Sequence, residues 1–308
     1  MKPSIPQYSV VVPVYRGVAT LAVLTRQLVA FFQNDGLSFE IIFVYDCGND
    51  NSWNILKEIK ARFPEVVNLV RLSRNTGQHT ATLCGFTVAQ GKFIITMDED
   101  LQHPPHQIAR LIETQKSGNF DLVYGLYQNR QHHFFRNIAA QVFAKLISIF
   151  IPHLHPHITS FRLVKSVFAR HAALMQTPYP FVDGHFAKLN AKTGSCLVEH
   201  QLPNLERGST YNLCRLIVHA FGILSGYTKL PFYLLIISLL SGTILGWHIL
   251  KHTVSFFNAL KQNNFMFLVF FLFSLTILLS SIILLWRYVN TKHRSYPIAG
   301  TFLSVSRF

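Results

Sequence analysis

The sequence KFIITMDEDLQHPP, residues Lys92–Pro105, changes character abruptly, because an apolar run typical of a buried strand ends in three consecutive acids. Four other short runs of β-branched or aromatic residues resemble its apolar half, and helix-length segments separate them. Alternating apolar strands and helices predict an α/β fold in which helices cover both faces of a mostly parallel sheet. The strands are expected at 8–13, 40–45, 66–72, 92–97 and 121–125, and the helices at 20–32, 52–62, 78–89 and 105–116.

The three acids lie where such a sheet binds ligands, beyond the carboxyl ends of its strands. On an extended segment side chains alternate in direction, so Asp98 and Asp100 are expected to face one way and Glu99 the other. Gln102 continues the alternation on the side of the two aspartates. Two carboxylates and an amide oxygen are hard ligands, which predicts a Mg²⁺ or Mn²⁺ site. The alternative interpretation is a helix N-terminal cap, because Asp, Gln and two prolines also favour a helix start.

Two common phosphate-binding fingerprints are missing from the sequence. No G-x-G-x-x-G follows an expected strand, and no G-x-x-x-x-G-K-[ST] occurs. Their absence argues against a dinucleotide-dependent oxidoreductase and against a P-loop enzyme. Arg74 and the start of the helix expected at 78–89 offer positive charge to an anion instead, because helix N-termini favour negative groups.

Charge is distributed unevenly along the 308 residues, which carry a net charge of +14. All 14 acids lie at or before Glu206, whereas the last third of the chain holds nine Lys and Arg residues and no acid. Pro231–Leu250 and Phe265–Trp286 are apolar runs without a charged residue, each long enough to cross a bilayer as a helix. The alternative is a pair of buried helices in a soluble protein. We expect a membrane partner for this second region.

Two crossings return the chain to its starting side, and the positive-inside rule then predicts that both ends face the cytoplasm. No signal peptide is expected, because the first apolar stretch is too short. The protein is therefore expected in the cell inner (plasma) membrane as a multi-pass protein. The expected parts are a cytoplasmic domain at 1–206, an amphipathic interfacial segment at 207–230, a two-helix transmembrane hairpin at 231–288 and a cytoplasmic tail at 289–308.

Six segments occur in the order and with the spacings of family 2 glycosyltransferases: SVVVPVY, EIIFVYDCGNDNSW, LSRNTGQHTATLCGF, GKFIITMDEDLQHPPHQI, DLVYG and SFRL. The sequence resembles most the polyprenyl-phosphate glycosyltransferase group, and is similar to dolichyl-phosphate mannose synthase and undecaprenyl-phosphate sugar transferases. The resemblance covers roughly Tyr8–Tyr211. It implies a GT-A-like fold and a metal-dependent hexosyltransferase that moves one sugar from a nucleotide-sugar donor to undecaprenyl or dolichyl phosphate.

The resemblance also implies roles for residues at matching positions. A nucleotide pocket, a metal that bridges the diphosphate, and arginines that meet donor or acceptor phosphates are expected. The nucleotide-sugar residues are Pro13, Tyr15, Asp46, Arg74 and Asp98, and the metal ligands are Asp98, Asp100 and Gln102. The catalytic candidates are Asp100, Arg136 and Arg162, and the acceptor-phosphate candidates are Arg130, Arg136, Arg207 and Ser209.

The sequence departs from the family pattern at several of these places. Tyr45 replaces the first acid of the usual pair after the second strand, and Gly17 replaces an acid after the first strand. The arginine that usually follows the fifth strand is displaced, so Arg130 is a stand-in, and Thr210 replaces a lysine. These departures concern the donor and the acceptor phosphate and leave the metal ligands intact.

The predicted mechanism follows from charge. A phosphomonoester acceptor is mostly a dianion at pH 7, so it can attack without losing a proton, and a single inverting displacement needs no general base. If the acceptor were a glycolipid or polysaccharide hydroxyl, which is the alternative activity, Asp183 would be the candidate base. The simpler interpretation of Asp183 is a turn residue before glycine.

The remaining alternatives come from other classes of protein and site. A non-catalytic membrane scaffold would have no need of clustered oxygen ligands, and a processive synthase should contain Q-x-x-R-W, which does not occur. The histidines of PHLHPH (residues 152–157) allow a zinc site, but the prolines favour an irregular loop. The expected partners are the donor, the lipid phosphate and a membrane, with no nucleic acid. Pairing of the membrane helices would give a homo-oligomer.

Overall fold

The computed structural model describes residues 5–127, 151, 153–177, 179–199 and 298–302, together with isolated helical positions between 222 and 283. These residues belong to two compact units. The first unit comprises Met1–Met175, Pro180–Tyr211 and Ser295–Phe308, and the second comprises Gln176–Tyr179 and Asn212–Arg294.

An eight-stranded sheet forms the centre of the described part of the first unit, with the strand order β7-β5-β6-β4-β1-β2-β3-β8. The four central strands β4, β1, β2 and β3 are parallel, and β7 pairs parallel with β5. β6 runs antiparallel to both β4 and β5, and β8 runs antiparallel to β3. The bounds are β1 Tyr8–Val14, β2 Phe39–Tyr45, β3 Val67–Leu72, β4 Phe93–Thr96, β5 Leu122–Tyr127, β6 Arg162–Lys165, β7 Thr193–Val198 and β8 Ile298–Phe302.

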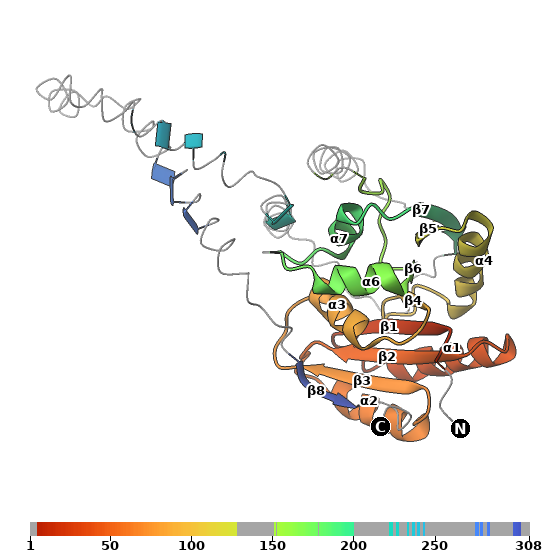
Figure 1. The fold of residues 1–308 in the computed structure, drawn as a ribbon. Coiled ribbons are helices and arrows are strands. Elements are labelled where there is room, and N and C mark those ends of the chain that lie inside the picture. The colour runs from red at the N-terminus through yellow and green to blue at the C-terminus, as the bar shows by residue number, and fades with distance from the viewer. Residues whose placement is uncertain are drawn as a thin grey trace, which may run out of the picture. The chain divides into compact units, whose positions relative to one another are not determined.

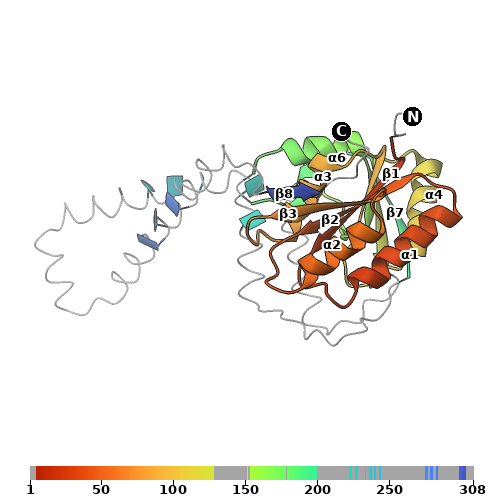
Figure 2. The same ribbon diagram turned by 90° about the horizontal axis from the view of Figure 1, so that it is seen from below.

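Helices cover both faces of this sheet, as Figures 1 and 2 show. Side chains of α1, α2 and α4 pack on one face, and side chains of α3, α6 and α7 pack on the other. The bounds are α1 Leu21–Asn34, α2 Ser52–Arg62, α3 Gln78–Val88, η1 Pro105–Gln107, α4 Ile108–Gly118, α6 Ser166–Leu174 and α7 Val182–Lys188.

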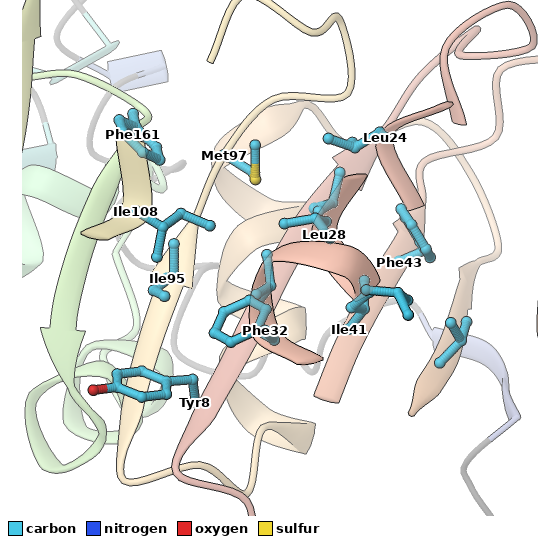
Figure 3. Packing of buried hydrophobic residues seen from close by; sticks show 14 of the residues in the cluster. Tyr8, Leu24, Leu28, Phe32, Ile41, Phe43, Ile95, Met97, Ile108 and Phe161 are labelled. Carbon is cyan, nitrogen blue, oxygen red and sulfur yellow. The ribbon is translucent and has the colours of Figure 1, made fainter. Parts of the chain in front are cut away.

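Alternation along the buried strands divides the core into two layers. Val10 and Val12 of β1 lie in the layer with α1, whereas Val11 between them lies in the layer with α3. Figure 3 shows the first layer, where Leu28 and Phe32 of α1 pack near strand residues. Burial on both faces explains the near-continuous apolar runs of these strands, and the prediction of a mostly parallel, helix-covered sheet is confirmed.

The last described segment of the chain is a strand that sequence analysis did not predict. β8 lies beside β3 at the edge of the sheet (Figure 1), with Val70 opposite Thr301. Part of the expected tail at 289–308 therefore belongs to the sheet unit. No local sequence pattern predicts pairing between residues so far apart in the chain.

The second unit is described only at isolated positions, and most of the expected interfacial segment and hairpin lies outside them. The described positions within the two expected membrane segments are helical. Nine of them expose large apolar side chains: Tyr233, Ile236, Ile237, Leu239, Leu240, Leu275, Leu279, Ile282 and Ile283. A search restricted to the described residues identifies no helix with both the length and the apolar character needed to span a bilayer.

Candidate functional site

The candidate site is formed by the loops that follow β1, β2 and β4. These strands are parallel neighbours, so their carboxyl ends meet at one edge of the sheet, as expected for a ligand site in such a fold. The loops hold Tyr15, Asp46 and Asp98. These loops contact one another, because the Tyr15 N–H donates to Glu99 at 3.4 Å and Arg16 Nε donates to the Gly48 carbonyl oxygen at 3.3 Å.

Asp98 is partly buried and both of its carboxylate oxygens accept hydrogen bonds. The Ser160 hydroxyl donates to Oδ2 at 2.6 Å, and the Gln78 side-chain amide donates to Oδ1. Burial raises the pKa of Asp98, while the Ser160 hydrogen bond and the positive charge of Arg162 act in the opposite direction. The protein therefore fixes the orientation of this carboxylate, and a cation beside it would favour its charged form.

The segment after β4 turns instead of continuing as an extended chain, so the expected simple alternation is wrong there. Leu101 has a φ of 64°, in the left-handed region, and the Gln102 N–H donates to Asp100 Oδ1 at 3.1 Å. η1 begins shortly after this turn, at Pro105. The residue that precedes η1 is Pro104 and the residue that precedes α4 is Gln107, and neither makes a side-chain capping hydrogen bond, so helix capping does not explain the acids.

The donor set after β4 fits a hard dication, which prefers carboxylate and amide oxygens and completes its shell with water and phosphate oxygens. Asp98, Asp100 and Gln102 are partly buried at the sheet edge. Among the described residues, no group of three or more His, Cys, Asp or Glu is arranged to hold a metal by itself.

Glu99 lies against the loop after β1. Its Oε1 accepts the Tyr15 N–H at 3.4 Å, and a Cβ at Gly17 would lie 2.9 Å from its Cγ. Burial raises the pKa of Glu99 to about 7, and the charges of Asp98 and Asp100 add to that effect. The glycine that departs from the family pattern thus leaves room for the extra acid between the two aspartates.

Asp46 at the end of β2 is buried and holds the loop before α3. Its carboxylate accepts the N–H groups of Thr76 and Gly77 at 2.7 and 2.8 Å, and the Thr76 hydroxyl at 3.1 Å. Burial raises the pKa of Asp46, and these donors oppose the shift. The described contacts give Asp46 a role in shaping the site, while a direct contact with the nucleotide-sugar stays a prediction.

Arg162 and Asp183 form a buried ion pair behind Asp98, with 3% and 4% of their surfaces exposed. Arg162 Nε also donates to Thr96 Oγ1 at 3.0 Å, and the Tyr124 hydroxyl donates to Asp183 Oδ1 at 2.8 Å. Burial lowers the pKa of Arg162, but the charge and hydrogen bond of Asp183, together with Tyr124 and Asp98, act in the opposite direction, and the net shift is upward. Asp183 is therefore not a turn residue, since it lies in the first turn of α7.

The other expected site residues are placed as follows. Pro13 is buried within β1, Tyr15 is 42% exposed with the Arg16 guanidinium 5.2 Å from its ring centre, and Arg74 is exposed. In the PHLHPH loop, His155 Nδ1 hydrogen-bonds to the backbone of His157, so this loop resembles an irregular turn more than a zinc site. Four candidates lie outside the described residues: Arg130, Arg136, Arg207 and Ser209.

Comparison with known families gives a match to the profile of Glycosyl transferase family 2 over residues 9–178, more than half of the chain. The chain belongs to glycosyl transferase family 2. The sheet edge described above lies within the matched residues, and the predicted family resemblance is confirmed.

Curated relatives of this family 2 glycosyltransferase include undecaprenyl-phosphate 4-deoxy-4-formamido-L-arabinose transferases. The protein of Edwardsiella ictaluri is 40% identical over 139 residues, which are 45% of this chain and 42% of the relative. The protein of Aeromonas hydrophila is 30% identical over 237 residues, which are 74% of this chain and 69% of the relative. Against the first of these, the alignment spans less than half of either protein.

Solved structures share the fold at low sequence identity. Glucosyl-3-phosphoglycerate synthase from Mycobacterium tuberculosis, in complex with phosphoglyceric acid, superposes with a TM-score of 0.52 at 14% identity, over 72% of this chain and 79% of that one. Mannosyl-3-phosphoglycerate synthase from Rubrobacter xylanophilus superposes with a TM-score of 0.50 at 13% identity, over 72% of each chain. The family 2 enzyme therefore has a GT-A-like α/β fold.

Three side chains that orient the site of this glycosyltransferase were not identified from the sequence: Gln78, Thr96 and Ser160. Two of them contact Asp98 directly, and Thr96 contacts Arg162. Gln78 and Ser160 lie in the quoted LSRNTGQHTATLCGF and SFRL segments. The family resemblance therefore indicates that these segments matter, but it does not predict which side chains they contact.

Proposed function

We propose that the protein transfers one sugar from a nucleotide-sugar donor to polyprenyl phosphate at the cytoplasmic face of a membrane, with Mg²⁺ or Mn²⁺ at Asp98 and Asp100. The observation that carries this proposal is the pair of carboxylates at the carboxyl end of β4, beside the loops that follow β1 and β2. The names of the curated relatives support a polyprenyl-phosphate acceptor.

The roles of the site residues follow from this arrangement. Asp98, held by Ser160 and Gln78, and Asp100 would hold the cation, which when bound offsets the charge that grows on the departing diphosphate. The exposed Tyr15 ring and Arg74 would meet the nucleotide and its phosphates. A phosphate acceptor attacks as an anion, so the chain need not supply a base.

The buried ion pair favours the phosphate acceptor over a hydroxyl acceptor. A hydroxyl would need a general base, and the candidate in this region was Asp183. Its Oδ1 accepts hydrogen bonds from Arg162 and Tyr124, and the side chain is buried. A carboxylate held in this way is poorly placed to take a proton from a substrate.

Chain connectivity supports the membrane hairpin. The segment from Asn212 to Arg294 leaves the sheet unit and returns to it, because β8 at Ile298–Phe302 pairs with β3. If this segment crosses a bilayer, it does so an even number of times, as a two-helix hairpin does. The helical, apolar and exposed positions within it suit contact with lipid.

The test is transfer of radiolabelled sugar by the full-length protein in detergent or nanodiscs. A panel of UDP and GDP sugars is offered with undecaprenyl or dolichyl phosphate, in Mg²⁺, in Mn²⁺ and in EDTA. We expect labelled lipid only with metal, and a loss of about 100-fold or more in Asp100→Ala, because changes around metal ligands alone typically cost 10–100-fold. Asp35→Ala, which removes an exposed acid after α1, is the matched control.

Transfer that persists in EDTA, or wild-type activity in Asp100→Ala, would refute the metal site. Transfer to a glycolipid hydroxyl in place of the lipid phosphate would refute the proposed acceptor.

A further inference from the structure

We propose that a row of hydrogen bonds, buried at one end and partly buried at the other, holds Asp98 in the orientation that binds the metal. We call this row the polar relay, and its members are Asp183, Arg162, Thr96 and Ser160. They are positioning residues, since they act through Asp98 and not on the substrate. This inference rests on the metal site proposed above.

The contacts of the polar relay are continuous. The Arg162 guanidinium donates from Nη1 to Asp183 and from Nε to Thr96 Oγ1, the latter at 3.0 Å. The Thr96 hydroxyl donates to the Ser160 carbonyl oxygen at 2.5 Å, and the Ser160 hydroxyl donates to Asp98 Oδ2 at 2.6 Å. Each link is a direct contact between protein atoms, so no bridging water is needed.

The direction of each hydrogen bond is determined by the available protons. Arginine has no acceptor, so Thr96 Oγ1 must accept from it, and the single threonine proton goes to the Ser160 carbonyl. Ser160 likewise has one hydroxyl proton, which its contact with Asp98 uses. Turning the Thr96 proton toward Arg162 would set donor against donor, and turning the Ser160 proton away from the Asp98 carboxylate would set two acceptors against each other, so one arrangement satisfies every link.

Sheet register explains why these side chains meet. Arg162 of β6 lies opposite Thr96 of β4 on one side and opposite Tyr124 of β5 on the other. Thr96, Arg162 and Tyr124 therefore form a row across three neighbouring strands. Thr96 precedes Asp98 by two positions in the sequence. Pairing of the strand backbones fixes the positions of these side chains relative to one another.

Burial explains why the row needs an acid at its far end. Arg162 is 3% exposed, and an unpaired buried charge is strongly unfavourable. Asp183 supplies the opposite charge from α7, and the Tyr124 hydroxyl donates to the same oxygen. Without Asp183, Arg162 would be expected to turn toward other acceptors, and Asp98 is the acid nearest along the relay.

The test measures Mn²⁺ binding to the full-length protein in the absence of substrate. The EPR signal of free Mn²⁺ reports how much of the metal is bound. Thr96→Val keeps the shape of the side chain and removes the hydroxyl, and Ser160→Ala removes the last link. We expect each to weaken Mn²⁺ affinity about 10–100-fold, which is the usual effect of losing groups that orient metal ligands. Thr96→Ser should restore the affinity lost in Thr96→Val.

The matched control is Thr25→Val. Thr25 is fully buried in α1 and its hydroxyl donates to the Leu21 carbonyl oxygen, so the same substitution is made at equal burial but outside the relay. We expect it to lower the unfolding temperature without changing Mn²⁺ affinity. Asp183→Asn should weaken Mn²⁺ affinity as the relay substitutions do, because it leaves Arg162 without its counter-charge.

Two outcomes separate the relay from the metal site itself. If Asp98→Ala loses Mn²⁺ binding while Thr96→Val and Ser160→Ala bind with wild-type affinity, the relay is refuted and the proposed function stands. If Asp98→Ala and Asp100→Ala both bind Mn²⁺ like the wild type, the proposed metal site fails. Should Thr96→Val not fold, Ser160→Ala decides, because Ser160 is only partly buried.

Discussion

Gly85 in α3 offers a sharp test of how the helix layer is held on the sheet. A Cβ at this position would lie 2.3 Å from Val11 Cγ1, 3.3 Å from Val11 Cγ2 and 3.2 Å from Val44 Cγ2. Carbon atoms prefer separations of about 3.5–4.0 Å. Both valines are fully buried and β-branched, so neither can move aside by changing rotamer.

The expected cost of Gly85→Ala follows from two opposing effects. Alanine favours a helix interior over glycine by about 1 kcal/mol. Overpacking a well-packed core costs about 1–3 kcal/mol, and a contact with a rigid strand side chain belongs at the upper end of that range. We therefore expect a net loss of about 2 kcal/mol, or about 4–8 °C in unfolding temperature for a unit of this size.

The assay is urea and thermal unfolding of the full-length protein, followed by circular dichroism. Val11→Ala opens the space that the new methyl group needs, so Gly85→Ala should cost less in a Val11→Ala background, with a coupling of about 1 kcal/mol or more. Thr87→Ala, at an exposed position of α3, is the control for helix propensity and should be neutral or slightly stabilising. If Gly85→Ala is as stable as the wild type, α3 does not pack on β1 as closely as described.

Three further predictions concern buried or crowded groups. Glu40→Ala should lower the free energy of unfolding, measured in urea, by about 3 kcal/mol. It leaves two side-chain donors and one backbone N–H without the buried carboxylate that accepts their hydrogen bonds. A loss below about 1 kcal/mol would contradict this. Burial lowers the pKa of His185 from 6.5 to about 4, so the unfolded chain gains a proton first as the pH falls. The free energy of unfolding should therefore fall by up to about 3 kcal/mol as the pH is lowered from 6.5 to 4. In His185→Asn, whose side-chain amide can replace the donor to the Ala172 carbonyl oxygen, this dependence on pH should be weaker. Gly17→Ala should cost about 1–2 kcal/mol because its Cβ would press on Glu99, and Glu99→Ala should relieve that cost in a double-mutant cycle of thermal unfolding.

Local patterns predicted most of the sheet unit. β1, β2 and β3 were identified because strands buried on both faces must be apolar along their whole length, and α1 and α2 because helix-length segments separate them. β6, β7 and β8 were not predicted, and β8 pairs across more than two hundred residues of sequence, so no local pattern predicts it. Strand pairing of this kind is a property of the whole sheet.

The site shows the same division. The placement of the acids directly after β4 followed from the sequence, because an apolar run that ends in acids shows where a strand ends. The turn at Leu101 did not follow, since leucine is not a residue that favours the left-handed region and nothing in the local sequence predicts it there. Asp183 was interpreted as a turn residue, because the partner that buries it, Arg162, lies 21 positions earlier in the sequence on a different element.

The amino-acid sequence alone determined that this chain has a helix-covered, mostly parallel sheet, a cluster of acids at one strand end and two long apolar segments, because each depends on residues adjacent in the chain. Only the tertiary structure decided which carboxylates lie partly buried at the strand end and which serve as buried counter-charges. Burial and hydrogen-bond partners determine that difference, and both come from strands and helices that meet only when the chain has folded.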